Sequence, residues 1–138
     1  MSDLFHPKVT DEFIGKVIEV MRLAKHHTFQ VLTKRPDRMR AMMKSFPNVW
    51  AGVSIEDQAT ADERIPLLLN TEASVRFISA EPLLGPVDLL LAAADSFSSM
   101  AGIHWVIAGG ESGPEARPMH PDWVRDIRDQ CLTAGVPF

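Results

Sequence analysis

Short apolar segments recur about every 20 to 30 residues along the chain, and the stretch between each pair has the pattern of a helix. A strand, a crossover helix and a second strand of this length form the βαβ unit, whose neighbouring strands run parallel. The strands are apolar on both faces, as expected when helices cover one face and a barrel interior or a second helical layer covers the other. The predicted strands are residues 28–33, 49–55, 75–79 and 103–108.

The sequence therefore predicts one α/β domain over residues 1–138, built as a partial parallel (β/α) barrel of about four to six βα units. Residues 11–25 place Phe13, Val17, Met21 and Ala24 at helical spacing, which predicts an amphipathic helix. Four further helices are predicted: from Pro36 to about Phe46, from residues 54–57 to Leu69, from Leu83 to Ala94 and from Pro121 to Ala134. Gly85 and Pro86 are expected to delay the start of the third of these. A loop is predicted at 96–102 and a strand cut short at 136–138.

Composition excludes several classes of protein. The chain has 46% hydrophobic residues, no apolar run near the roughly 20 residues that cross a bilayer, and no basic segment ahead of an apolar stretch at its start, so we expect a cytoplasmic protein. A net charge of -4 argues against a general nucleic-acid coat. The basic side chains at 34, 35, 38 and 40 make nucleic acid conceivable, but a solvated basic helix face is the favoured interpretation. Cys131 alone forms neither a disulfide nor a cluster site, and we expect a buried, inert thiol.

Polar residues follow each predicted strand at the point where it ends. In parallel α/β folds these positions share one face, so their side chains converge on one pocket. The alternative is that they cap the helices that follow, which stays open for any single residue. The predicted pocket residues are Asp3, if residues 1–5 end a missing strand, then Thr33, Lys34, Arg35, Ser54, Glu56, Ser79 and Glu81; a second group is Gly109, Gly110, Glu111 and Ser112.

Two kinds of chemistry fit these residues. Glu81 and Glu111 beside a lysine suit acid and base catalysis or the binding of a cation. Gly109 and Gly110 let the backbone turn and expose N–H groups, which suits a phosphate or carboxylate; the alternative is a glycine turn leaving a crowded strand. Arg117 is either an anion partner or an ordinary surface arginine, with the second favoured. The histidines lack metal-ligand spacing, so we predict no metal site.

Five sequence segments resemble those of uncharacterised bacteriophage and bacterial proteins with a radical-SAM-like barrel. They span nearly the whole chain in the order of that family: residues 1–6 (MSDLFH), 29–36 (FQVLTKRP), 50–56 (WAGVSIE), 76–83 (RFISAEPL) and 105–113 (WVIAGGESG). The resemblance implies a barrel fold. It also places the chain as the C-terminal portion of a longer enzyme, without the first strand and the closing strand.

The resemblance implies S-adenosylmethionine and a [4Fe-4S] cluster for the full-length family, whose three-cysteine motif precedes the matching region. This chain lacks that motif, so we expect no cofactor in it and no catalysis by it alone. By the same resemblance, Gly109, Gly110 and Glu111 are candidates for contacts to the methionyl part. The alternatives are a non-catalytic binding or assembly module and a metal-dependent hydrolase that uses Glu81 and Glu111. Because a partial barrel leaves its sheet edges open, we expect self-association or a partner chain there.

Overall fold

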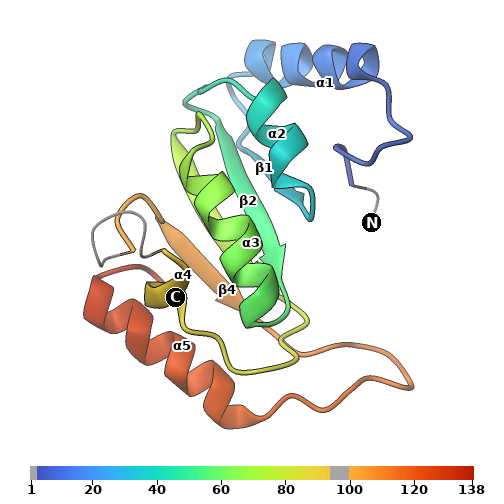
Figure 1. Ribbon diagram of the computed structural model, residues 1–138. Coiled ribbons are helices and arrows are strands. Elements are labelled where there is room, and N and C mark those ends of the chain that lie inside the picture. The colour runs from blue at the N-terminus through green and yellow to red at the C-terminus, as the bar shows by residue number, and fades with distance from the viewer. Residues whose placement is uncertain (1–2, 94–99) are drawn as a thin grey trace.

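The computed structural model describes residues 3–93 and 100–138 and contains one parallel sheet (Figure 1). Its four strands lie side by side in sequence order, and every neighbouring pair is parallel. This order follows from repeated βαβ units, because each crossover helix returns the chain to the same end of the sheet. The strands are β1 (Phe29–Thr33), β2 (Val49–Ile55), β3 (Val75–Ala80) and β4 (Trp105–Ala108).

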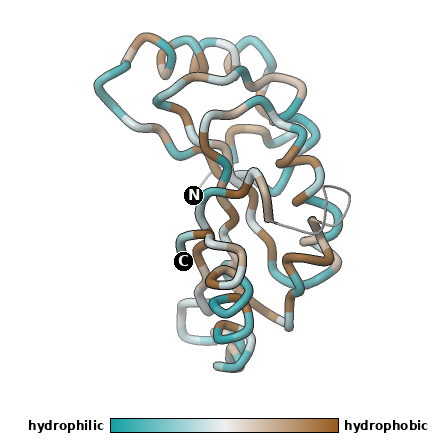
Figure 2. The backbone as a smooth tube through the Cα atoms, turned by 90° about the vertical axis from the view of Figure 1, so that its left-hand side faces the viewer, coloured by the Kyte–Doolittle hydropathy of each residue, from teal (hydrophilic) through white to brown (hydrophobic). Residues whose placement is uncertain are grey.

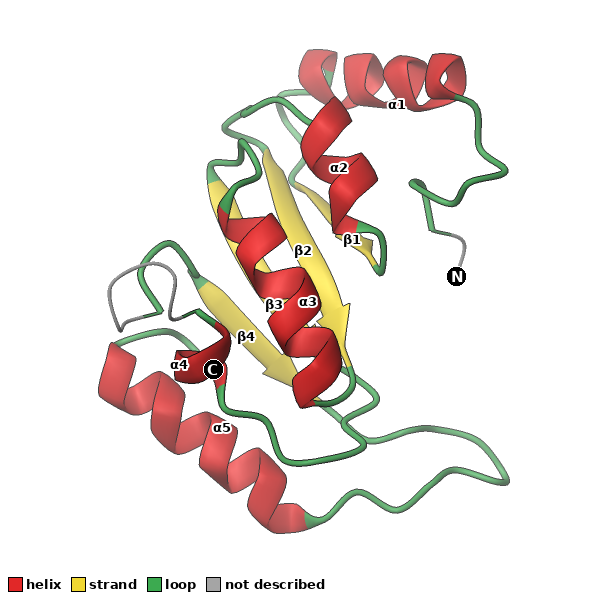
Figure 3. Cartoon of the chain, in the orientation of Figure 1, coloured by secondary structure: helices red, strands yellow, loops and turns green. Residues whose placement is uncertain are grey.

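The helices form a layer on one side of the sheet (Figures 1 and 3). Their local sequences explain where they begin and end. The Asp57 side chain accepts from the Thr60 N–H and forms a capping box, and Gly135 adopts the left-handed conformation that ends the last helix. The helices are α1 (Asp11–Leu23), α2 (Pro36–Met42), α3 (Gln58–Leu69), α4 (Leu89–Ala92) and α5 (Pro121–Ala134).

The core lies between this helical layer and the sheet face that it covers. Strand residues such as Val53, Ile55 and Val106 are fully buried there, together with Ile65 of α3 and Ile127 of α5. Figure 2 shows hydrophobic (brown) and hydrophilic (teal) residues alternating along much of the backbone. Among the described helices, none combines the length and the apolar character that a membrane crossing requires.

The opposite face of the sheet carries a row of side chains from all four strands. The register places Leu32, Gly52, Phe77 and Trp105 side by side. The Phe77 ring lies across Gly52 and packs against Trp105, with ring centroids 6.0 Å apart. Towards the carboxyl ends of β2 and β3 the same face presents only the small Ser54 and Ser79. The aromatic rings therefore fill the lower part of this face and leave room at the strand ends.

Both edges of the sheet are open, although short segments begin to extend it. The N–H of Val106 donates to the carbonyl of Pro137 at 3.0 Å, so the end of the chain contacts β4, but residues 136–138, predicted as a strand cut short, do not form a strand. At the other edge, Asp3 binds the end of β1. The parallel α/β arrangement is confirmed, whereas a barrel is not shown, because four strands form an open sheet.

Several helices differ from their predicted extents. The helix after Pro36 ends at Met42, not near Phe46. Of the helix predicted at 83–94, only α4 forms among the described residues, which end at residue 93 in this part of the chain. The loop predicted at 96–102 also falls largely outside the described residues. Phe13, predicted on the apolar face of α1, is 56% exposed, because α1 turns Ile14 towards the core in its place; Met21 is buried as predicted. Cys131 is buried, and burial raises the pKa of its thiol to about 11.

Candidate functional site

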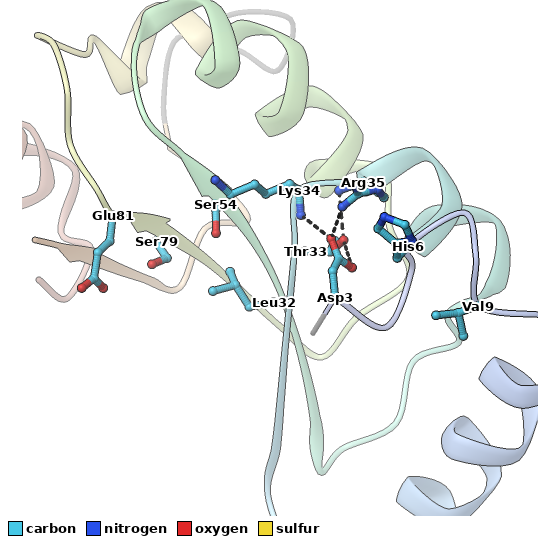
Figure 4. Close-up of a pocket in the computed structure, with 10 residues that line it drawn as sticks. All are labelled: Asp3, His6, Val9, Leu32, Thr33, Lys34, Arg35, Ser54, Ser79 and Glu81. Carbon is cyan, nitrogen blue, oxygen red and sulfur yellow. Dashed lines mark hydrogen bonds and ion pairs between the residues drawn. The ribbon is translucent and has the colours of Figure 1, made fainter. Parts of the chain in front are cut away.

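A pocket of about 710 Å³ lies at the carboxyl ends of β1, β2 and β3 (Figure 4). Its walls come from four parts of the chain: the N-terminal segment, and the ends of the three strands. Parallel strands bring these parts together because all their carboxyl ends meet at one edge. The lining residues are Asp3, His6, Val9, Leu32, Thr33, Lys34, Arg35, Ser54, Ser79 and Glu81.

Asp3 fixes the N-terminal segment to the end of β1. Its carboxylate accepts from the Thr33 hydroxyl at 2.7 Å, the Lys34 N–H at 3.2 Å and the Arg35 guanidinium at 2.8 Å (Figure 4), and from the Phe5 N–H at 2.9 Å. Burial acts to raise the pKa of this carboxyl, but the four donors outweigh it and hold the pKa below the ordinary value. Asp3 is therefore an ionised anchor of the pocket wall.

The Asp3→Asn substitution is expected to lower the free energy of unfolding by about 1 to 3 kcal/mol, because an amide cannot accept four hydrogen bonds as a carboxylate does. Since the folded pKa is depressed, the stability that Asp3 contributes is present above the ordinary carboxyl pKa and is lost as the pH falls below it. Urea denaturation at pH 7 measures the change. Asp126→Asn on the exposed surface of α5 is the control, and equal effects of the two substitutions would contradict the anchoring role.

Lys34, whose side chain is half exposed, is held at the pocket rim by an ion pair with a largely buried carboxylate. Its ammonium pairs with one oxygen of Glu56, and the other Glu56 oxygen accepts from Arg64 at 2.9 Å. Arg64 also donates to the carbonyl of Ser54 at 2.7 Å. The Glu56 and Arg64 side chains are only 12% and 13% exposed, so this network is shielded from water on the helical side of the strand ends.

Glu81 follows β3 and faces the pocket from the side opposite Asp3 (Figure 4). The backbone around it is fixed at both sides. The Gly109 N–H donates to the carbonyl of Ala80 at 3.1 Å, and the Leu83 N–H donates to the carbonyl of Gly109 at 2.9 Å. Gly109 also lies against the Glu81 side chain, since a Cβ there would be 3.2 Å from the carboxylate. The Glu81 side chain is exposed, and no hydrogen bond or ion pair joins its carboxylate to another described residue.

The group from Gly109 to Ser112 lies beyond β4 and does not line the pocket. Here the Glu111 carboxylate forms a bidentate ion pair with the Arg117 guanidinium, at 2.7 Å from Nε and 2.9 Å from Nη2. It also accepts from the backbone N–H of Arg117 at 3.0 Å. The guanidinium lowers the pKa of Glu111 to about 2. The two carboxylates predicted to act together are therefore in different situations: Glu111 is paired, and Glu81 faces the pocket.

Replacing Arg117 with glutamine is expected to raise the pKa of Glu111 from about 2 towards the ordinary 4.5. The ion pair in the native protein contributes above pH 4.5 and is lost as the pH falls towards 2, so the variant should titrate within that window. Carbon-13 NMR of the carboxyl groups measures the pKa directly. A Glu111 titration that is unchanged by the substitution would show that Arg117 is not its partner in solution.

The structure brings most of the sequence-predicted residues together. Asp3, Lys34, Arg35, Ser54 and Glu81 line one pocket, and Glu56 stands behind Lys34 without lining it. Helix capping explains Asp57 but not Glu56, which binds Arg64. Sequence reasoning missed His6, Val9 and Leu32 of the pocket lining, and Arg64 behind it. No sequence motif identifies these residues. His6 and Val9 reach the pocket from a loop, and Arg64 contacts Glu56 from the helix that follows it.

The described residues contain no group of three or more histidine, cysteine or acidic side chains that suits a metal ion. A [4Fe-4S] cluster held by three thiolates does not fit these 138 residues either, because they include one cysteine, and that cysteine is buried on α5. The basic residues considered for nucleic acid are largely engaged: Arg35 binds Asp3, and Arg38 binds the carbonyls of His6 and Val9 and the carboxylate of Asp11.

No curated protein and no solved structure matches the chain. The family described as "Protein of unknown function (DUF5131)" matches residues 1–138, the whole of this sequence. Its description names no activity, cofactor or source. The chain belongs to this family of proteins of unknown function.

Proposed function

We propose that the strand-end pocket is the ligand-binding part of a radical-SAM-like enzyme and that it binds S-adenosylmethionine. The observation that carries the proposal is the convergence of four chain segments on one pocket at the carboxyl ends of parallel strands. That edge is where α/β folds bind their ligands. The phrases at the strand ends, which resemble those of radical-SAM-like proteins, form the same walls: residues 29–36, 50–56 and 76–83.

The chemistry of the lining suits this ligand. S-adenosylmethionine has an amino-acid end with opposite charges, a sulfonium and a ribose with hydroxyl groups. The pocket offers the cations of Lys34 and Arg35, the carboxylate of Glu81, and the hydroxyls of Ser54 and Ser79. Its volume of about 710 Å³ lies within the range of roughly 300 to 1,000 Å³ that is common for small-molecule pockets.

Reductive cleavage of the cosubstrate is not assigned to these residues. Three cysteine thiolates would have to come from outside the 138 residues, so the chain's own contribution to such an enzyme is binding and orientation. The hydrolase alternative needs Glu81 and Glu111 to share a metal ion. Because Arg117 already occupies Glu111 with three hydrogen bonds, we do not carry that alternative forward.

Isothermal titration calorimetry with S-adenosylmethionine tests the proposal. We expect saturable binding with one molecule per chain. Adenosine in a parallel titration is expected to bind more weakly, because it lacks the charged groups that Lys34, Arg35 and Glu81 would meet. The absence of saturable binding at millimolar S-adenosylmethionine would overturn the proposal and would favour a non-catalytic assembly module.

A further inference from the structure

The first helix, α1, carries apolar side chains on two of its sides. One side has Ile14 and Met21, which are buried in the core. The other has Phe13, Val20 and Leu23, whose side chains are 56%, 61% and 62% exposed. Of the six large hydrophobic side chains that are exposed in the described part of the chain, three lie on this one helix. Apolar side chains scattered singly over a surface need no explanation, whereas a gathered set indicates a binding surface.

The exposed side chains belong to one continuous stripe along α1. Phe13, Val17, Val20 and Ala24 follow one another at intervals of four, three and four residues, and Leu23 lies beside Val20 and Ala24. Val17 and Ala24 are partly exposed and connect the more exposed members. Intervals of three and four residues are those by which two helices pack along a shared apolar seam. We call these five residues the outer stripe.

Contacts on the other side of α1 show that the outer stripe points away from the rest of the protein. Arg38 of α2 pairs with the carboxylate of Asp11. Val20 follows Asp11 by nine residues, about two and a half turns of an α-helix, so the two side chains project from opposite sides. In Figure 1, α1 lies at one end of the molecule, with α2 as its neighbouring helix. The outer stripe is therefore accessible to another molecule.

We propose that the outer stripe binds the same stripe on a second copy of this chain, with the two α1 helices antiparallel. Under two-fold symmetry one surface is its own partner, so a single stripe suffices for a closed dimer. Charge complementarity favours the antiparallel orientation. Asp11 and Glu12 are in the first turn, whereas Arg22 is in the last turn and Lys25 follows it. An antiparallel copy places the acidic start of each helix beside the basic end of the other, and a parallel copy would place like charges together.

Sedimentation equilibrium of the native chain, from micromolar to millimolar concentration, tests the dimer. Because five side chains per copy form a small interface, we expect a dissociation constant of about 1 to 100 μM. The mass should rise with concentration from 15.3 kDa to twice that value. A native chain that stays monomeric at millimolar concentration would overturn the proposal. The proposed function would still stand, because α1 contributes no side chain to the pocket lining.

Val20→Glu in the middle of the stripe should raise the dissociation constant by roughly tenfold or more, because it buries a charge at two symmetry-related places in the interface. Leu132→Glu is the matched control. Leu132 is 70% exposed on α5, so the same kind of change outside the stripe should leave the dissociation constant unchanged. Circular dichroism checks that both variants fold. A Val20→Glu dimer as tight as the native one, or a dimer weakened only by Leu132→Glu, would overturn the proposal.

An exchange of charges tests the antiparallel orientation. Glu12→Lys should weaken the dimer, because it faces Lys25 of the second copy, and Glu12→Lys combined with Lys25→Glu should restore it. A double variant no tighter than Glu12→Lys would overturn the antiparallel arrangement. Backbone amide signals of the native chain, followed by NMR during dilution, test the location without any substitution. We expect the shifts to cluster at residues 13–24, and shifts confined to other elements would overturn the proposal.

Discussion

Replacing Arg64 with methionine is expected to lower the free energy of unfolding by about 3 kcal/mol. Arg64 and Glu56 are 13% and 12% exposed, and their contact at 2.9 Å is shielded by α3 and the end of β2. Removing the guanidinium leaves the Glu56 carboxylate in a largely buried place with only Lys34 as a partner, and it also removes the donor to the Ser54 carbonyl. Uncompensated burial of one charge of a pair has a cost of this size.

Arg40→Met is the matched control. Arg40 is exposed on α2, so the same change should alter stability by less than about 0.5 kcal/mol. The double variant Arg64→Met with Glu56→Gln should recover part of the loss, because the buried carboxylate charge is then removed, while the half-exposed Lys34 ammonium stays in contact with water. Chemical denaturation of the four proteins gives the values. An Arg64→Met variant as stable as Arg40→Met would show that the network contributes nothing to the strand ends.

Gly52→Ala is expected to lower the free energy of unfolding by about 1 to 3 kcal/mol, the usual range for overpacking a core. A Cβ at this position would lie 2.4 Å from the Cζ of Phe77, well inside van der Waals contact. The ring cannot simply turn away, because Phe77 is 2% exposed and packs against Trp105. The substitution should therefore disturb the row of side chains below the pocket and not only one contact.

Gly15→Ala provides a control of opposite sign. Gly15 lies within α1 with no atom within 4 Å of the added Cβ, so alanine should stabilise the helix by roughly 0.5 to 1 kcal/mol. Thermal denaturation followed by circular dichroism compares the two variants. If Gly52→Ala were stabilising like Gly15→Ala, the close approach of Phe77 to the β2 backbone would not exist in solution.

The sequence predicts the parallel α/β arrangement because its signals are local. Apolar runs, the proline at the start of α5 and Gly135 at its end each act over a few residues, and they place the elements correctly. Closure of the sheet depends on contacts between distant parts of the chain, which periodicity does not encode. One residue of the predicted apolar face of α1 was misplaced for a similar reason: Phe13 and Ile14 are both apolar, and only packing selects Ile14.

The residues of the candidate site likewise fall into those that the sequence could predict and those that it could not. Topology alone brings the ends of β1, β2 and β3 to one edge, so Lys34, Ser54 and Glu81 could be predicted to converge. The arginine partners of two of the acidic residues could not be predicted. Arg64 supports Glu56 from a helix, and Arg117, interpreted from the sequence as an ordinary surface side chain, is the partner of Glu111. These pairs depend on side-chain reach, which the order of residues does not reveal.

A titration of isotope-labelled protein with S-adenosylmethionine, followed by the backbone amide signals in NMR, tests whether the strand-end pocket binds this ligand. We predict that the shifted signals cluster at residues 32–35, 54–56 and 79–81, with the helical layer unaffected. Saturation of these shifts at one ligand per chain would place the ligand at the strand ends. Shifts confined to the helices, or no shifts at millimolar ligand, would contradict the assignment of this pocket as the binding site.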